Sequence, residues 1–449
     1  MPAALDKVFK AYDVRGIYPD QLDEELAERV GRAFVALTGA GTLAIGQDMR
    51  PSSKPMADAL AEGAMAQGAD VLRVGLCSTD MLYYVSGALD VAGVMLTASH
   101  NPARYNGLKL CRPGAVPVGE ESGLADIKRM VAAGEPAADA AERGRERQAD
   151  DLLERYAAHV RSFADRDALR PLKVVADAGN GMAGHVVPAV FAGLPFELVS
   201  MYFELDGSFP NHPADPLNPE NLRELQARVV AEGADVGLAF DGDADRVFLV
   251  DEQGATVPSS LVGALVARLL CEREPGATVL YNLICSRVVP ETIREAGGVP
   301  VRTRVGHSFI KGVMAETGAI FGCEHSGHYY FRDNWRADSG IIAALVVLEQ
   351  LAQAGVPLSE LRKPFERYAA SGEINTKVTD QKSAMEKVAG AFPDAPKDTL
   401  DGLSVDAGDF WFNVRPSNTE PLLRLNLEAT DSDTCARATD QVLALIREA

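Results

Sequence analysis

One local pattern recurs along this chain and limits its fold more than any other feature. A stretch with helical spacing of apolar residues ends at a glycine that leads directly into an apolar strand, at Gly68-Ala69-Asp70-Val71 and again at Gly233-Ala234-Asp235-Val236. A looser copy stands at Gly297-Gly298-Val299-Pro300-Val301. Glycine after a helix supplies a left-handed C-cap, and helices that alternate with apolar strands are typical of α/β folds. The repetition therefore predicts three similar α/β units.

The length and the last part of the chain complete the domain prediction. A chain of 449 residues is too long for one core, and its 47% of hydrophobic residues provides buried surface for several. Residues 131–151 show little apolar periodicity and are predicted to form a surface connection. After residue 365 the pattern changes to strands that flank a polar loop, with helices between them, which indicates a small α+β domain. We expect α/β domains with mixed sheets at 1–148, 149–254 and 255–364, and the smaller α+β domain at 365–449.

Charge and cysteine usage limit the partners. The formal net charge of −20 argues against nucleic acid or an anionic membrane as a partner. The six cysteines are scattered without a C-x-x-C pair, and the first residues lack a secretory apolar segment, which favours reduced thiols and a cytoplasmic location. The longest apolar run, Ile341 to Leu348, is too short to cross a bilayer, and we expect one buried helix there.

An acidic loop follows the apolar run Ala234 to Phe240. Acids at alternate positions of an extended backbone project to one side, and Asp241, Asp243 and Asp245 have this spacing. Three carboxylates at such short separation would raise one another's pKa values unless a hard divalent cation lay among them. The spacing also matches an EF-hand loop with Glu252 at its twelfth position, but Arg246 occupies the sixth position, which needs glycine. We therefore favour a magnesium site over a calcium loop or a solvated acidic turn.

Two further loops can each be interpreted either as a structural turn or as a functional site. Ser99 lies in Thr97-Ala98-Ser99-His100-Asn101-Pro102 after an apolar run, where it is either a turn residue or a nucleophile that needs activation. The glycine-rich turn Gly179 to Gly184 departs from the G-x-G-x-x-G spacing of dinucleotide-binding loops, and a tight strand-to-helix turn explains it better.

With these motifs, the chain resembles the alpha-D-phosphohexomutase family, which interconverts sugar 1-phosphates and sugar 6-phosphates. The resemblance covers most of the chain and rests on motifs in the family's order. These are Tyr12-Asp13-Val14-Arg15-Gly16, the serine and aspartate loops, Val305-Gly306-His307, Glu324-His325-Ser326-Gly327-His328, and Arg415-Pro416-Ser417-Asn418-Thr419-Glu420-Pro421. It implies four domains around a central cleft.

The resemblance also implies a role for each matching residue. Ser99 carries the phosphoryl group, and with the three aspartates it would bind one Mg²⁺, while a sugar 1,6-bisphosphate serves as intermediate and activator. Lys109 and His328 match the positions for proton transfer, and Arg15 and Arg246 match cleft arginines suited to the phosphoryl group. The substrate is a phosphorylated hexose. It would be bound by Tyr12, His100, Gly306, His307, Glu324, His325, Ser326, Gly327, Arg415, Ser417, Asn418 and Thr419. Without the other motifs, the Arg415 loop reads as an ordinary hairpin turn.

Two positions depart from the family pattern. Lysine is frequent in the strand that here reads Asn282-Leu283-Ile284-Cys285, and Arg304 and Lys311 are the candidates to replace that cation. Cys323 stands where a second glycine usually precedes the glutamate.

The Glu-His-Ser-Gly-His loop resembles the phosphomannomutase branch more than the phosphoglucosamine mutases. We therefore expect interconversion of mannose 1-phosphate and mannose 6-phosphate, with glucose phosphates as further substrates, by a monomer or weak dimer. The alternatives are a phosphoglucomutase, a phosphoglucosamine mutase, a magnesium-dependent sugar phosphatase and a non-catalytic sugar-phosphate binder.

Overall fold

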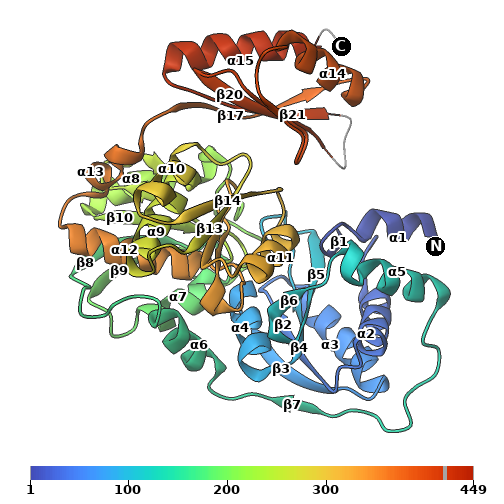
Figure 1. Ribbon diagram of the computed structural model, residues 1–449. Helices are drawn as coiled ribbons and strands as arrows, with labels where there is room; N and C mark the ends of the chain where they lie inside the picture. Colours follow the sequence, from blue (N-terminus) through green and yellow to red (C-terminus); the bar gives the residue numbers. More distant parts are fainter. Residues whose placement is uncertain (1, 418–421, 448–449) are drawn as a thin grey trace. The chain divides into compact units, whose positions relative to one another are not determined.

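The computed structural model describes residues 2–417 and 422–447 and divides into two compact units. Unit 1 comprises Met1–Val262 with Ser326–Leu361, and unit 2 comprises Gly263–His325 with Arg362–Ala449. Figure 1 shows the elements along the chain, and each unit is described on its own below.

The first sheet of unit 1 has the strand order β1-β5-β4-β2-β3-β7, with β6 beside β5. The strands β2, β3, β4 and β7 run parallel, whereas β1 and β5 are antiparallel to their neighbours. Two long helices, α2 and α3, pack side by side on this sheet and bury apolar residues such as Phe34 and Leu60 (Figure 1). The strands are β1 (Val14–Ile17), β2 (Thr42–Gln47), β3 (Asp70–Leu76), β4 (Ala92–Leu96), β5 (Tyr105–Arg112), β6 (Val116–Pro117) and β7 (Glu146–Gln148). The helices are α1 (Pro2–Val8), α2 (Glu24–Thr38), α3 (Ser53–Ala66), α4 (Thr79–Leu89), α5 (Leu124–Ala133) and α6 (Leu152–Arg161).

The second sheet of unit 1 has the order β12-β11-β10-β8-β9 and is also mixed. Its elements are β8 (Leu172–Asp177), α7 (Ala183–Phe191), β9 (Phe196–Met201), α8 (Arg223–Glu232), β10 (Val236–Phe240), β11 (Val247–Asp251) and β12 (Thr256–Val257). Residues 326–361 add β16 (Tyr329–Phe331), α12 (Gly340–Ala354) and most of α13 (Leu358–Arg362).

The apolar run at Ile341 lies in α12, where every residue from Gly340 to Ala352 is buried. Within residues 2–417 and 422–447, no single helix is long and apolar enough to cross a membrane. One bent pair, α12 with Leu358–Phe365, passes that test by length and composition.

Unit 2 contains a parallel sheet and an antiparallel sheet. In the parallel sheet, β13 (Thr278–Asn282) lies between β14 (Val299–Thr303) and β15 (Phe321–Cys323), and the chain crosses over through α10 (Val288–Glu295) and α11 (His307–Thr317). The long helix α9 (Ser259–Arg273) leads into it from unit 1. The antiparallel sheet has the order β17-β21-β20-β19-β18, and α14 and α15 cover one face of it (Figure 1). Its elements are β17 (Ala369–Lys377), α14 (Gln381–Ala391), β18 (Lys397–Asp398), β19 (Leu403–Asp406), β20 (Phe410–Pro416), β21 (Leu422–Ala429) and α15 (Ser432–Arg447).

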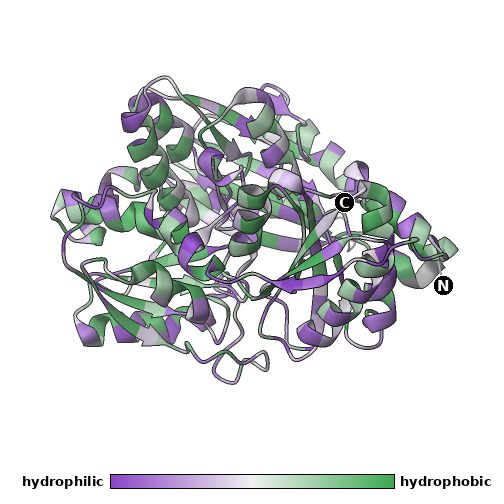
Figure 2. Ribbon diagram, turned by 90° about the horizontal axis from the view of Figure 1, so that it is seen from below, coloured by the Kyte–Doolittle hydropathy of each residue, from purple (hydrophilic) through white to green (hydrophobic). Residues whose placement is uncertain are grey.

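The glycine stops predicted from the sequence have the expected conformation. Gly68, Gly233 and Gly297 have φ of 86°, 58° and 80°, and the strands β3, β10 and β14 follow them. The fold prediction of α/β domains with mixed sheets and a smaller C-terminal α+β domain is confirmed. Within residues 131–151 the structure places the short, exposed strand β7 beside β3, which the sequence pattern did not indicate. Hydrophobic and hydrophilic residues alternate along many of the helices in Figure 2, as expected for helices with one buried face.

Candidate functional site

The serine loop follows the buried strand β4. Ser99 is 5% exposed and has a φ of 48°, a left-handed conformation that side chains rarely adopt. Its backbone N–H donates to Thr97 Oγ1 at 3.0 Å. A non-glycine residue in this region is strained, so other contacts must hold the loop in place.

Arg50 provides those contacts, although the sequence analysis did not single it out. Its side chain is fully buried, and its Nε donates to Asp48 Oδ2 at 3.1 Å. The remaining guanidinium N–H groups donate to the backbone carbonyls of Ser99, Asn101, Pro102 and Tyr105 at 2.7–3.0 Å. All five donors of the guanidinium are therefore used on the serine loop and Asp48. The sequence signal was the pair Asp48 and Arg50 directly after the predicted strand at 42–46.

The aspartate loop connects β10 to β11 and lies against the serine loop. The Ser99 hydroxyl donates to Asp241 Oδ2 at 2.6 Å. A Cβ on Gly242 would lie 2.4 Å from the Ser99 carbonyl oxygen, so only glycine allows the two loops to approach this closely. The side chains of Asp241, Asp243 and Asp245 are buried, and one oxygen of each lies within 4.8 Å of the others. The structure thus brings together the predicted hydroxyl and the three predicted carboxylates.

Two cations and a second hydroxyl contact this acidic cluster. Lys109 Nζ lies 2.7 Å from Asp243 Oδ2 and 2.6 Å from Asp245 Oδ2. Arg246 Nε donates to Asp241 Oδ2 at 2.9 Å, and its NH2 group lies 3.3 Å from Ser99 Oγ. Thr79 Oγ1, at the start of α4, donates to Asp243 Oδ2 at 2.5 Å. Thr79 is a second residue that the sequence analysis missed, because its loop showed no pattern beyond a helix start.

The cluster fits a divalent cation. Three carboxylates face two cations, and the buried oxygens Asp243 Oδ1 and Asp245 Oδ1 have no hydrogen-bond partner among the described residues. Burial raises the pKa of Asp241 to about 7. The charge of Arg246 acts in the opposite direction, and the neighbouring charges of Asp245 and Asp243 add to the increase. For Asp243, burial acts to raise the pKa, but Lys109 outweighs it and the pKa is lowered. Orphaned carboxylate oxygens in a buried all-oxygen set are suited to Mg²⁺.

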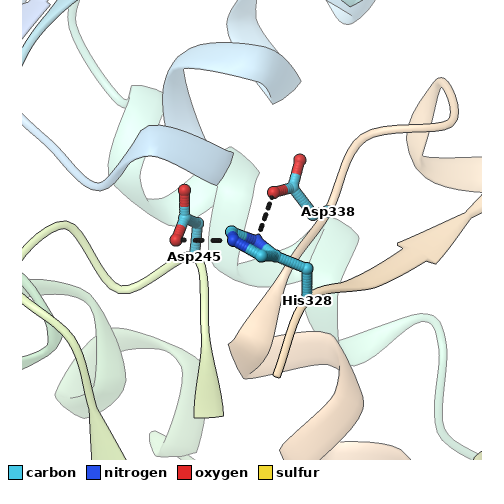
Figure 3. Close-up of side chains that lie close together, drawn as sticks. All are labelled: Asp245, His328 and Asp338. Carbon is cyan, nitrogen blue, oxygen red and sulfur yellow. Dashed lines mark hydrogen bonds and ion pairs between the residues drawn. The ribbon is translucent and has the colours of Figure 1, made fainter. Parts of the chain in front are cut away.

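His328 stands beside this cluster with a partner of its own. Its Nδ1 lies 2.9 Å from Asp338 Oδ2 and 3.9 Å from Asp245 Oδ1, as Figure 3 shows. Burial acts to lower the pKa of His328, but the charges of Asp245 and Asp338 and the Asp338 hydrogen bond outweigh it, so the pKa is raised. Asp338 was not predicted, since no motif marked it. The interaction fixes Nδ1 and leaves Nε2 as the nitrogen that can exchange a proton.

Arg15 and His100 complete the set in unit 1. Arg15 NH1 donates to Asn101 Oδ1 at 2.8 Å, and NH2 pairs with Asp13. His100 Nδ1 lies 3.2 Å from Ser99 Oγ. Burial, together with the charges of Arg246 and Arg15, lowers the pKa of His100 to about 2, so its ring stays neutral. Tyr12 is half-buried just before β1.

In unit 2, the predicted Glu324 and Gly306 lie together. Glu324, which follows β15, is 3% exposed, and its Oε1 accepts hydrogen bonds from Gly306 N at 3.0 Å and from Asn282 Nδ2 at 3.4 Å. His307 begins α11 directly after Gly306. The boundary between the units falls inside the predicted recognition loop, so Ser326 and Gly327 belong to unit 1.

The predicted phosphate loop contains more positive charge than the sequence motif indicated. Arg415 on β20 is the direct register partner of Arg424 on β21, and both guanidinium groups share one carboxylate, Glu373, at 3.5 and 3.4 Å. Burial and the charge of Arg415 lower the pKa of His325, and they outweigh the charge of Glu373, which acts to raise it. The Ser417 N–H donates to the Leu422 carbonyl at 3.0 Å and closes the loop. The predicted residues Asn418 and Thr419 lie outside the described residues.

The two candidates to replace the family lysine have different surroundings. The Arg304 guanidinium lies over the Phe309 ring at 4.2 Å from its centroid, and Lys311 is 3% exposed within α11.

The site places a hydroxyl within a cluster of carboxylates and cations on α/β domains. This arrangement is typical of a phosphoryl-transfer enzyme. Comparisons with known proteins agree with this class. Family models for the phosphoglucomutase/phosphomannomutase domains I, II and III and the C-terminal domain match residues 6–137, 154–254, 258–368 and 373–445. The chain belongs to the phosphoglucomutase/phosphomannomutase family, and it is a phosphohexomutase, an isomerase of carbohydrate metabolism.

Three relatives illustrate the likeness. The chain is 41% identical over 445 residues to a protein named "Phosphohexose mutases" from Xanthomonas campestris pv. campestris, covering 98% of this chain and 99% of the relative. It is 39% identical over 451 residues to a phosphomannomutase of Salmonella typhimurium, with coverage of 98% and 99%. A crystal structure of a phosphoglucomutase/phosphomannomutase family protein from Burkholderia thailandensis has a TM-score of 0.89 and 33% identity, and the match covers 98% of this chain and 97% of that one.

Proposed function

We propose that this chain is a phosphomannomutase that interconverts mannose 1-phosphate and mannose 6-phosphate and also accepts glucose phosphates. The observation that carries the proposal is the 2.6 Å hydrogen bond between Ser99 and Asp241 inside the buried acidic cluster. The phosphomannomutases among the relatives support mannose as the sugar.

Ser99 is the proposed carrier of the phosphoryl group. Its Oγ would give the phosphoryl to a hydroxyl of the bound monophosphate, forming the sugar 1,6-bisphosphate, and would then take back the other phosphate. Arg246 lies 3.3 Å from this oxygen and would orient the phosphoryl group, because a guanidinium matches its planar donor geometry. Arg50 would keep the loop in its strained conformation through each transfer.

Asp241, Asp243 and Asp245, with an oxygen of Ser99, would hold one Mg²⁺. The bound ion would neutralise charge on the transferring phosphoryl group. Lys109, which already contacts two of these carboxylates, and His328, which Asp338 holds at Nδ1, are the proposed groups for proton transfer to and from the sugar hydroxyl and Ser99.

Residues of unit 2 would recognise the rest of the substrate. Glu324 would accept hydrogen bonds from sugar hydroxyls, as it does from the Gly306 N–H, and His307 follows Gly306 in the chain. Arg415, Ser417, Asn418 and Thr419 would bind the phosphate that is not being transferred. Arg424 joins this set in the proposal because it pairs with Arg415 in register.

The deciding experiment compares turnover of mannose 1-phosphate, glucose 1-phosphate and glucosamine 1-phosphate by the magnesium-loaded full chain. Mannose 1-phosphate should give the highest kcat/KM, with glucose 1-phosphate second. A clear preference for the amino sugar would contradict the assignment. Release of inorganic phosphate as the main product would instead indicate a phosphatase, and binding without turnover or phosphate on Ser99 would indicate a sugar-phosphate binder.

A further inference from the structure

The two segments that depart from the family pattern each contain a cysteine, and these cysteines lie together in unit 2. Cys285 follows β13 and Cys323 ends β15, and these strands are parallel neighbours with Tyr281 opposite Cys323. The Cys285 thiol lies 3.7 Å from the Cys323 carbonyl oxygen, so the two residues are in contact. A disulfide requires the two sulfurs to approach to about 2.05 Å, and contact between the residues brings them within reach of that geometry.

Both cysteines are linked to Glu324 by short paths. Cys323 is its neighbour in the chain. The Cys285 thiol donates to Asn282 Oδ1 at 3.0 Å, and the other end of that amide, Nδ2, donates to Glu324 Oε1 at 3.4 Å. A change at the two sulfurs therefore reaches the Glu324 carboxylate through one amide and one peptide bond.

A cleft gives access to the first of the two sulfurs. A cavity of about 550 Å³ within unit 2 is lined by Cys285, and Cys323 does not line it. Its walls carry both charges, because Arg287 pairs with Asp406 and Arg302 pairs with Asp398. The Cys285 residue is 3% exposed, so a small oxidant would reach its sulfur through this cavity.

The second thiol is suited to respond to the first. Its hydrogen bond with Cys285, together with burial, raises the pKa of Cys323 well above its usual value. Cys323 is therefore protonated and weakly nucleophilic in the reduced protein, which leaves Cys285 as the sulfur that meets peroxide first.

We propose that Cys285 is an oxidative modification site that reacts with hydrogen peroxide and is then joined to Cys323 by a disulfide. The Cys285 sulfur attacks one peroxide oxygen, the O–O bond breaks, and a sulfenic acid forms as water leaves. The Cys323 sulfur then attacks the oxidised sulfur, the S–O bond breaks, and the thiol proton leaves with the hydroxyl as a second water. The two sulfurs lose two electrons in total, and the peroxide gains them.

The disulfide acts on substrate recognition, a consequence that rests on the proposed function. It removes the S–H donor from Asn282 and pulls the backbone next to Glu324 towards β13. KM for the sugar phosphate should rise about tenfold, the usual effect of losing one charge-assisted hydrogen bond. Dithiothreitol should reverse the change.

The experiment treats the full chain with hydrogen peroxide, removes the excess with catalase, labels free thiols with N-ethylmaleimide under denaturing conditions and digests with trypsin. Mass spectrometry should find residues 274–287 joined to residues 312–332, with the loss of two hydrogens. Labelled thiols on both peptides, or a stable sulfinic or sulfonic acid at Cys285 without a link, would overturn the proposal.

The variants separate the chemistry from general damage. Cys285→Ala and Cys323→Ala should each abolish the disulfide link. Each should also abolish the effect of peroxide on KM, which is measured as the ratio of KM in the oxidised protein to KM in the reduced protein of the same variant. Cys435→Ala, which removes another buried cysteine, should behave like the wild type. The mass readout does not depend on turnover, so it stands even where the proposed substrate is wrong. A link that forms without any change in KM would confirm the modification site and contradict its effect on Glu324.

Discussion

At the scale of single residues, the site consists of charges that are buried together and balanced against one another. Asp241, Asp243 and Asp245 tolerate burial because Lys109 and Arg246 contact them. Two of their oxygens, Asp243 Oδ1 and Asp245 Oδ1, accept no hydrogen bond from the described residues and show where this balance is incomplete. A change of one charge should therefore alter metal affinity more than it alters folding.

The substitution Asp243→Asn tests this balance. An amide keeps the shape but removes a charge that a divalent cation requires, so magnesium affinity should fall and turnover should drop by about 100-fold or more. Isothermal titration with Mg²⁺ and a mutase assay measure the two effects. Asp126→Asn, at an exposed position on α5, is the control and should change neither. Unchanged magnesium affinity in Asp243→Asn would remove this carboxylate from the metal site.

Arg50 offers a second test at this scale. Lysine keeps the charge but cannot reproduce the planar fork that contacts four carbonyls and Asp48, so Arg50→Lys should destabilise the fold by about 3 kcal/mol and slow phosphorylation of Ser99. Denaturant unfolding and the rate of phosphate incorporation measure these effects. Arg29→Lys, on the exposed side of α2, is the matched control. If Arg50→Lys matched the wild type in both measurements, the serine loop would not depend on this guanidinium.

At the scale of elements, glycines determine how closely the strands and loops approach. Gly242 allows the aspartate loop to contact the serine loop, and Gly181 lets the turn before α7 pack against Gly242. Three loops from different parts of unit 1 are thus stacked through backbone contacts. Their spacing depends on the absence of a side chain.

The pair Gly242→Ala and Gly390→Ala distinguishes this role from a general effect of glycine. A methyl group at Gly242 would meet the Ser99 carbonyl at 2.4 Å, so this change should destabilise the fold by about 1–3 kcal/mol and reduce Ser99 phosphorylation. Gly390 lies in α14 with nothing within 4 Å of an added Cβ, and its replacement should stabilise by about 0.5–1 kcal/mol. Thermal unfolding measures both. Equal shifts for the two variants would contradict the role of Gly242.

The segment before α8 carries a pH-dependent contact. His212 Nε2 lies 3.0 Å from Asp177 Oδ2 at the end of β8. Burial acts to lower the pKa of His212, but the Asp177 hydrogen bond and charge outweigh it, so the folded pKa is raised. A raised histidine pKa adds stability that is complete below the unfolded value of about 6.5 and is lost as the pH rises through the folded value.

The measurement compares the unfolding free energy of the wild type with that of His212→Gln between about pH 5.5 and pH 8.5. The wild type should be more stable at the acidic end, and the difference should shrink towards the alkaline end. His185→Gln is a control of opposite sign, because burial lowers the pKa of His185 and its contribution should improve as the pH rises. A His212 difference that grows with pH would refute the assignment.

The sequence predicted the elements that have strong local signals. The glycine stops at Gly68 and Gly233 predicted β3 and β10, because the C-cap and the apolar strand are both local features. It missed the short strands β1 and β7, which have too few residues to show a pattern. It also missed Arg50 and Asp338, because their roles come from contacts between residues far apart in the chain, and only the folded structure shows those contacts.

At the scale of the whole molecule, the proposed chemistry is divided between the two units. Unit 1 holds the hydroxyl, the acidic cluster and the groups for proton transfer, whereas unit 2 holds Glu324 and the Arg415 loop. Substrate recognition can thus be altered in unit 2, as the two cysteines would do, without changing the groups that transfer the phosphoryl. The central claim is that Ser99 carries that phosphoryl between substrate and intermediate.

The most direct test of this claim follows phosphate on Ser99 by mass spectrometry in the magnesium-loaded full chain. Incubation with mannose 1,6-bisphosphate should place one phosphate on Ser99. Later addition of mannose 1-phosphate should remove it and yield one equivalent of bisphosphate. Ser99→Ala should neither take up phosphate nor turn over. Mutase turnover in Ser99→Ala, or phosphate that enters another residue and transfers from there, would contradict the account.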